Sequence, residues 1–149
     1  MSLKERITED MKQALRAREQ DRLRAIRLLQ AAIQRQEVDQ RTALDDAGIT
    51  ATVEKLIKQS RDALEHFTKA GREDLIAMEN GDIAVWQAYL PEPLSDDELD
   101  ELIDQAIKDT GASSMKEMGK VMGTLKPKVQ GRADMAKVSG KLKTKLSAG

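Results

Sequence analysis

The residues best suited to chemistry lie between Met118 and Asp134, a stretch that combines three glycines, a proline and several cations. Gly119 and Gly123 are four residues apart, so in a helix they share one face. Such a face leaves a smooth strip that another backbone or a nucleic-acid sugar can approach closely. Gly131 predicts a turn before a new helix, because Asp134 is a favourable N-cap. The chemistry expected here is recognition of phosphate groups.

Basic residues are concentrated at the end of the chain. Residues 113–149 hold nine bases and two acids, whereas residues 91–112 hold eight acids and one base. A local excess of positive charge favours an anionic partner such as nucleic acid, with an affinity that falls steeply with salt. The candidate phosphate contacts are Lys116, Lys120, Lys126, Lys128, Arg132, Lys137, Lys141 and Lys145.

The placement of these cations can also be predicted. The lysines at 137, 141 and 145 recur every four residues, which predicts a cationic stripe along the last helix. Lys126, Lys128 and Arg132 are expected in the loop before that helix, close to its free backbone N–H groups. Two simpler interpretations compete: a lysine-rich face that only serves solubility, and a Gly119–Gly123 pair that allows close helix packing within the domain.

Several other kinds of site are not expected. The chain has no cysteine, which excludes disulfides, cysteine-bound zinc and thiol catalysis. His66 is the single histidine and is expected at the surface, not as a metal ligand. The acids at 96–104 are expected to cap a helix and to line a solvated face. We therefore expect no catalytic residue, no metal and no cofactor.

The composition predicts an all-α protein of two helical units. Phe67, Trp86 and Tyr89 are the only aromatic residues, and sheets normally use more aromatic and β-branched side chains. Two prolines at residues 91–93 cannot continue a helix, so they mark a linker. The expected domains are residues 1–90, a helical hairpin array or bundle, and residues 94–149, a small three-helix unit.

Local signals predict the helix ends and the buried positions. Capping boxes are expected at Ser2–Glu5, Ser95–Glu98 and Ser114–Glu117. The stretch 43–50 resembles a loop, so the third helix is expected to open at Thr50 or Thr52. Met78 and Met115 are expected to be buried. Residues 1–20 do not resemble a signal peptide and no apolar run is long enough to span a membrane, so we expect a cytoplasmic protein without a membrane partner.

The stretch 119–134 resembles the signature of the GatB/YqeY family. That signature has a Gly-x-x-Met-Gly pattern followed by a Lys-x-x-Gly-Arg-Ala-Asp pattern, here residues 119–123 and 128–134. Residues 69–75 (Lys-Ala-Gly-Arg-Glu-Asp-Leu) and 89–91 (Tyr-Leu-Pro) are similar to the stand-alone YqeY-like branch. The resemblance extends over essentially the whole chain.

The resemblance implies an all-α fold with a three-helix tail that clamps the elbow of folded tRNA. In this family the same module ends the B subunit of the tRNA-dependent amidotransferase and is appended to some glutaminyl-tRNA synthetases. It implies close-approach roles for Gly119 and Gly123, phosphate contacts for Lys128 and Arg132, and a turn at Gly131. The amidotransferase's catalytic half has no counterpart in these residues.

Together these observations predict a non-catalytic tRNA-binding accessory protein connected with the formation of Gln-tRNA or Asn-tRNA. One alternative is a protein–protein adaptor whose N-terminal helices dock a synthetase or an amidotransferase. Another is a component related to the amidotransferase, a carbon–nitrogen ligase with glutamine as amido donor, that is active only with other subunits.

Overall fold

The computed structural model describes residues 1–148, and in that range it contains seven α-helices, one short 3₁₀ helix and no strand. The expected all-α class is confirmed. The chain divides into two compact units, which we call unit 1, from Met1 to Leu90, and unit 2, which begins at Pro91. Within the described residues, no helix combines the length and the apolar character needed to cross a membrane.

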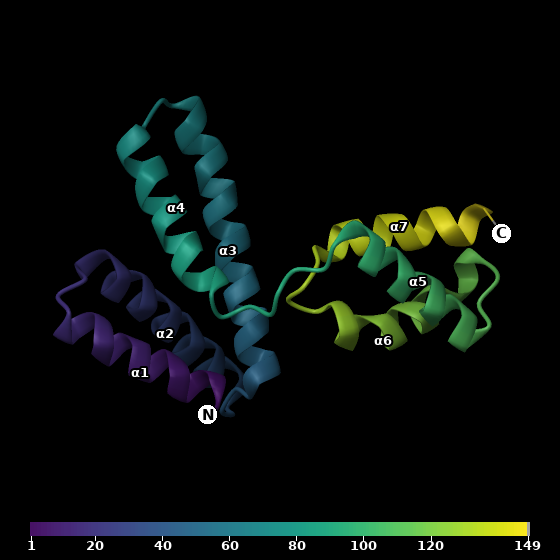
Figure 1. Ribbon diagram of the computed structural model, residues 1–149, viewed down its shortest axis with the longest axis horizontal. Helices are drawn as coiled ribbons and strands as arrows, with labels where there is room; N and C mark the ends of the chain where they lie inside the picture. The colour runs from purple at the N-terminus through teal and green to yellow at the C-terminus, as the bar shows by residue number, and fades with distance from the viewer. Residues whose placement is uncertain (149) are drawn as a thin grey trace. The chain divides into compact units, whose positions relative to one another are not determined.

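Unit 1 consists of two helical hairpins. The first is α1 (Leu3–Arg16) with α2 (Gln20–Gln40), and the second is α3 (Asp46–Lys69) with α4 (Glu73–Gln87), as Figure 1 shows. Both hairpins turn within a few residues, so consecutive helices run antiparallel. Gly71, with a φ of 67°, occupies the left-handed position that ends α3. The Lys-Ala-Gly-Arg motif at 69–72 is thus the turn of the second hairpin.

Three local predictions in unit 1 need correction. The third helix begins at Asp46, not at Thr50 or Thr52, because the side chain of Asp45 accepts a hydrogen bond from the N–H of Gly48 at 2.9 Å and caps the helix earlier. Ser2 accepts from the N–H of Glu5 at 3.1 Å, which is only half of a capping box. Met78 is 38% exposed rather than buried.

Polar groups inside unit 1 tie the helices together. The indole N–H of Trp86 donates to the carbonyl of Ala25 at 2.8 Å, which joins α4 to α2. The hydroxyl of Tyr89 donates to Asp10 at 2.7 Å, and burial together with this bond raises the pKa of Tyr89. The guanidinium of Arg6 lies 5.0 Å from the centre of the Tyr89 ring. These bonds satisfy polar groups that burial would otherwise leave unpaired.

One ion pair in unit 1 has a buried carboxylate. Arg24 of α2 donates to Asp82 of α4 at 3.0 Å, and the Asp82 side chain is only 6% exposed. Burial raises the pKa of Asp82, although the charge of Arg24 acts in the opposite direction. The pair therefore links two helices, but the desolvation of the carboxylate opposes its stabilising effect.

Unit 2 contains α5 (Asp96–Thr110), the 3₁₀ helix η1 (Met115–Glu117), α6 (Met118–Val129) and α7 (Met135–Ala148). Ser95 and Glu98 form the predicted capping box of α5, and Gly111 ends that helix with a φ of 67°. The box predicted at Ser114 is wrong, since Ser114 makes no side-chain capping bond and is followed by a 3₁₀ turn. Met115 is 38% exposed rather than buried.

The core of unit 2 is a separate apolar cluster. Each helix contributes side chains three or four residues apart, which places them on one face. The contributing residues are Leu99, Ile103 and Ala106 of α5, Val121, Leu125 and Val129 of α6, and Val138, Leu142 and Leu146 of α7. With these faces turned inward, the remaining faces present the charged side chains to solvent.

Candidate nucleic-acid interface

Helix α6 separates an apolar face from a basic, glycine-containing face. Val121, Leu125 and Val129 are buried on its inner side, in the core of unit 2. Gly119, Gly123 and Pro127 follow one another at intervals of four on the outer side and are exposed, as are the flanking Lys120 and Lys126. The outer face of α6 thus combines accessible helix backbone with positive charge.

The glycines on this face are not required by packing within the chain. A Cβ atom added at Gly119 or Gly123 meets no heavy atom within 4 Å, and the same holds for Gly140 in α7. Close helix packing within the domain is therefore not the reason for the Gly119–Gly123 pair. The prediction of a turn at Gly131 agrees with its buried position and its φ of 78°.

Two lysines predicted in a loop belong to α6 instead. The helix continues through Pro127 to Val129, so Lys126 and Lys128 lie in its last turn and only Arg132 lies in the connection to α7. A proline has no N–H, so Pro127 cannot donate to the carbonyl of Gly123. Gly123 is exposed, so its carbonyl is accessible to water, and helix α6 continues past the missing bond.

Arg132 has a structural role that the sequence did not reveal. Its Nε donates to the carbonyl of Glu92 at 3.0 Å, and its own carbonyl accepts from the N–H of Leu94 at 2.8 Å. These two bonds hold the segment before α5 against the turn before α7. The phosphate contact implied for Arg132 stays a prediction, and any substitution there also removes this anchor.

A ladder of three ion pairs joins α5 to α7. Asp96 accepts from Lys137, Asp100 from Lys141 at 2.9 Å, and Asp104 from Lys145 at 2.6 Å. Each lysine lies 41 residues after its aspartate in the sequence. The two helices therefore run parallel with a constant register. The three pairs, Asp96–Lys137, Asp100–Lys141 and Asp104–Lys145, are called the α5–α7 ladder below.

The ladder changes the interpretation of the lysines on α7 and of the acids on α5. The hydrogen bond from Lys137 lowers the pKa of Asp96, and the hydrogen bond to Asp100 raises the pKa of Lys141, so both groups are held in their charged forms. The predicted stripe of lysines does lie along one face of α7, but each of its three lysines is paired with an acid, and their role as phosphate contacts stays a prediction. Likewise, Asp96, Asp100 and Asp104 do more than line a solvated face. Their matching spacing in the sequence was the available signal for this pairing.

Five lysines that follow α5 in unit 2 remain without such partners, and among the described residues Lys108, which lies beside the acids of α5, is unpaired as well. In the described part of the chain they are exposed and take part in no ion pair or hydrogen bond of their side chains. They are Lys116 in η1, Lys120, Lys126 and Lys128 in α6, and Lys143 in α7. We call them the free lysines. Of the candidates predicted from charge, the structure leaves four in this state, adds Lys143, and pairs Lys137, Lys141 and Lys145 with acids.

Comparison with known proteins identifies the relatives of this sequence. The family described as Yqey-like protein matches residues 4–146. A protein of Pyrenophora tritici-repentis named "Altered inheritance of mitochondria protein 41, mitochondrial" is 31% identical over 146 residues, which covers 96% of this chain and 80% of that protein.

Proteins of the same name occur among the relatives from two yeasts. The one from Eremothecium gossypii is 33% identical over 85 residues, covering 56% of this chain and 46% of the relative. The one from Saccharomyces cerevisiae is 31% identical over 100 residues, covering 66% and 53%. The chain thus aligns with about half of each of these two relatives.

Proposed function

Because the chain belongs to the Yqey-like protein family, we propose that it is an accessory protein that binds folded tRNA through the free lysines of unit 2. The resemblance to the tail of the amidotransferase B subunit connects this role with the formation of Gln-tRNA or Asn-tRNA and favours the tRNA elbow as the site held. The protein supplies binding, and the chemistry belongs to its partners.

The observation that carries the proposal is the division of the lysines that follow α5 in unit 2 into two classes. The α5–α7 ladder neutralises three of them, whereas the free lysines have no acidic partner among the described residues. Three free lysines lie on α6, within nine residues of one another. Phosphate groups that replace water at such side chains release bound counterions, which drives association at low salt.

The distribution of aromatic residues favours a folded RNA over a single strand. Phe67, Trp86 and Tyr89 all belong to unit 1, so unit 2 offers no aromatic ring on which an exposed base can stack. Recognition then depends on the shape and the backbone of the RNA. The exposed backbone around Gly119 and Gly123 lets a sugar–phosphate chain approach α6 more closely than side chains would allow.

The test is a tRNA titration at several salt concentrations with the wild type and with Lys120→Gln/Lys126→Gln/Lys128→Gln. These side chains are exposed and unpaired, so the triple variant keeps its fold. We expect a weaker affinity and a shallower dependence of log K on log salt, by roughly 0.7 to 0.9 for each phosphate that the variant no longer neutralises.

A charge swap in the ladder is the matched control. The variant Asp100→Lys/Lys141→Asp reverses the middle pair without changing the net charge. If tRNA binds through the free lysines, its affinity should not change with this swap. If tRNA binds through the lysines of α7, its affinity should fall, because α7 loses a cation. If the wild type fails to bind tRNA even at low salt, the proposal is wrong and the adaptor alternative takes its place.

A further inference from the structure

Helix α2 has an outer face that nothing in unit 1 covers. Its inner face buries Ala25, Ile26, Leu29 and Ile33. On the opposite side, Leu28 is 45% exposed and Val38 is 67% exposed. Isolated exposed apolar side chains are common on protein surfaces, but here they belong to a pattern.

That pattern has the spacing of a helix–helix contact. The positions 24, 28, 31, 35 and 38 follow one another at intervals of four, three, four and three, which keeps them on a single stripe of the helix. We call Arg24, Arg27, Leu28, Ala31, Arg35 and Val38 the α2 outer strip. The small Ala31 at its centre allows a second helix to come close, and Leu28 and Val38 lie on either side of it.

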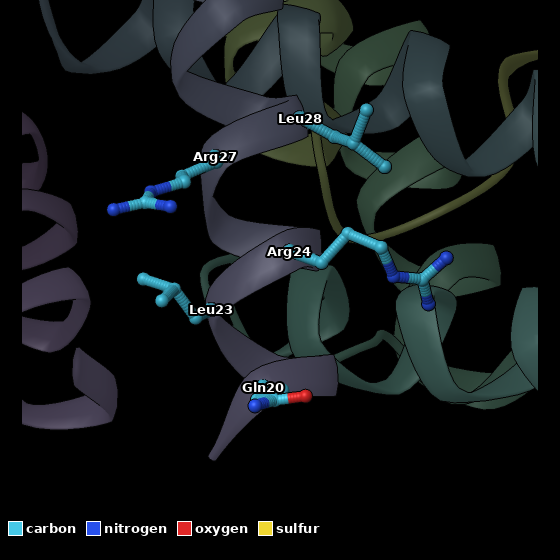
Figure 2. Close-up of a pocket in the computed structure, with 5 residues that line it drawn as sticks. All are labelled: Gln20, Leu23, Arg24, Arg27 and Leu28. Atoms are coloured by element: carbon cyan, nitrogen blue, oxygen red, sulfur yellow. The ribbon is translucent and has the colours of Figure 1, made fainter. Parts of the chain in front are cut away.

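Arginines surround the apolar residues of the strip. Figure 2 shows Leu23 and Arg27 leaving α2 on one side and Arg24 and Leu28 on the other, around a shallow depression. Within the described residues, Arg27 and Arg35 make no ion pair or hydrogen bond, and Arg24 is paired with Asp82. The strip contains no acid, so its charge is complementary to an anionic surface.

We propose that the α2 outer strip is a docking surface for an acidic amphipathic helix of another protein. The apolar positions of that helix would pack on Leu28, Ala31 and Val38, and its carboxylates would pair with Arg27 and Arg35. This inference goes beyond RNA binding by unit 2 and does not depend on it.

Charge and apolar exposure exclude the competing occupants as first choices. A second copy of the strip would place arginines against arginines, which is unfavourable. An RNA backbone satisfies the arginines but offers no apolar surface to Leu28 and Val38. Arginine is favoured at the centres of protein interfaces, since its planar group pairs with carboxylates and its stem packs on apolar side chains.

The first experiment identifies what lies on the strip in the cell. A photo-crosslinking amino acid replaces Gln34, which is exposed beside the strip, in the full chain expressed in its own organism. Asp62, exposed on α3, serves as the control position. Mass spectrometry of the adduct is expected to find an acidic, helix-forming peptide of another protein at position 34 only. An adduct with RNA, with a second copy or with a basic peptide overturns the proposal, as does the absence of any specific adduct.

The second experiment measures the contact with purified components. The peptide identified by crosslinking is titrated with the wild type and with Arg27→Glu/Arg35→Glu, which should weaken binding about tenfold or more. The control Arg18→Glu/Arg61→Glu makes the same change of net charge at two exposed, unpaired arginines outside the strip and should weaken binding less than about threefold.

A third variant separates apolar packing from charge. Leu28→Ser/Val38→Ser is expected to weaken the same peptide at both low and high salt, because the loss does not depend on charge. Circular dichroism checks that each variant keeps its helices. Equal weakening by the strip variant and by the Arg18/Arg61 control shows nonspecific attraction and overturns the proposal, as does unchanged binding by the strip variants.

Discussion

The two units use different cations for different purposes. Ten of the eleven arginines lie in unit 1, whereas nine of the fourteen lysines lie in unit 2. In unit 1, Arg24 makes a single bond to a buried carboxylate, and in unit 2 three lysines form a ladder at the surface. Arginine is the better partner for a desolvated carboxylate because its charge is delocalised and weakly hydrated. Lysine, strongly hydrated, serves exposed faces.

The comparison also separates charges that hold the fold from charges that remain available. In unit 1 the hydrogen bonds of Trp86 and Tyr89 and the bond from Arg24 to a buried carboxylate join one helix to another, so these polar groups hold the fold. In unit 2 the acids of the ladder neutralise three lysines on α7, and most of the remaining positive charge is carried by the free lysines. The difference teaches that the count of basic residues does not measure a binding face, because paired and unpaired lysines look the same in composition.

The largest effect is expected from truncating the core of unit 1. Trp86 is 3% exposed and its indole N–H bonds to Ala25, so Trp86→Ala should lower the free energy of unfolding by about 3 to 5 kcal/mol. Hydrogen exchange followed by mass spectrometry should show faster exchange in α2 and α4 and little change in α5–α7, whose core is a separate cluster. Uniform loss of protection in both units would contradict this division.

The next effect contrasts an ion pair whose carboxylate is buried with one whose carboxylate is partly exposed. Arg24→Ala leaves the carboxylate of Asp82 buried without its partner, which should cost about 2 to 3 kcal/mol. Lys141→Ala breaks a solvated rung of the ladder and should have a much smaller effect. Thermal unfolding measured by Trp86 fluorescence and by circular dichroism compares the two. Equal destabilisation would remove the distinction drawn between the units.

A smaller effect is expected at the exposed helical glycines. Gly123→Ala and Gly140→Ala both add a methyl group into open space, so each should stabilise its helix by about 1 kcal/mol. If tRNA lies along α6, Gly123→Ala should also weaken tRNA binding, whereas Gly140→Ala, beside the ladder lysine Lys141, should not. Calorimetry and the tRNA titration measure both quantities, and equal affinities for the two variants would exclude close approach at Gly123.

The smallest effect concerns acid stability, where the two units should respond with opposite signs. The pKa of Asp96 is lowered by Lys137, so its contribution is present above its ordinary value of 3.8 and is lost as the pH falls through the lower folded pKa. The pKa of Asp82 is raised by burial, so the folded state takes up its proton more readily and unit 1 gains stability as the pH falls toward 3.8.

Unfolding monitored at different pH values checks this difference. Trp86 fluorescence reports on unit 1, and amide NMR signals of α7 report on unit 2. As the pH falls from neutral to about pH 4, protonation of Asp82 should increase the stability of unit 1. Below about pH 4, the ladder of unit 2 should weaken. A parallel response of Asp82→Asn and wild type in unit 1 would contradict the role given to burial.

Some local errors show where sequence patterns are ambiguous. The third helix starts at Asp46 because Asp45 caps it, but Asp-Asp-Ala-Gly is also typical of a loop. Lys126 and Lys128 were expected in a loop, yet the helix continues through Pro127 because the carbonyl of Gly123, which loses its helical donor, is accessible to water. Met78 and Met115 fit the apolar periodicity of their helices, but each is only partly covered and remains 38% exposed.

The sequence by itself determined the helical class, the boundary marked by the prolines near residue 92, the apolar face of each helix and the region where bases accumulate. These depend on local propensity and periodicity. Only the tertiary structure decided which lysines are free, because the partners of the ladder lie 41 residues apart on two different helices. An ion pair requires its two charged groups to lie within about 4 Å, and the packing of α5 against α7 is what brings them together.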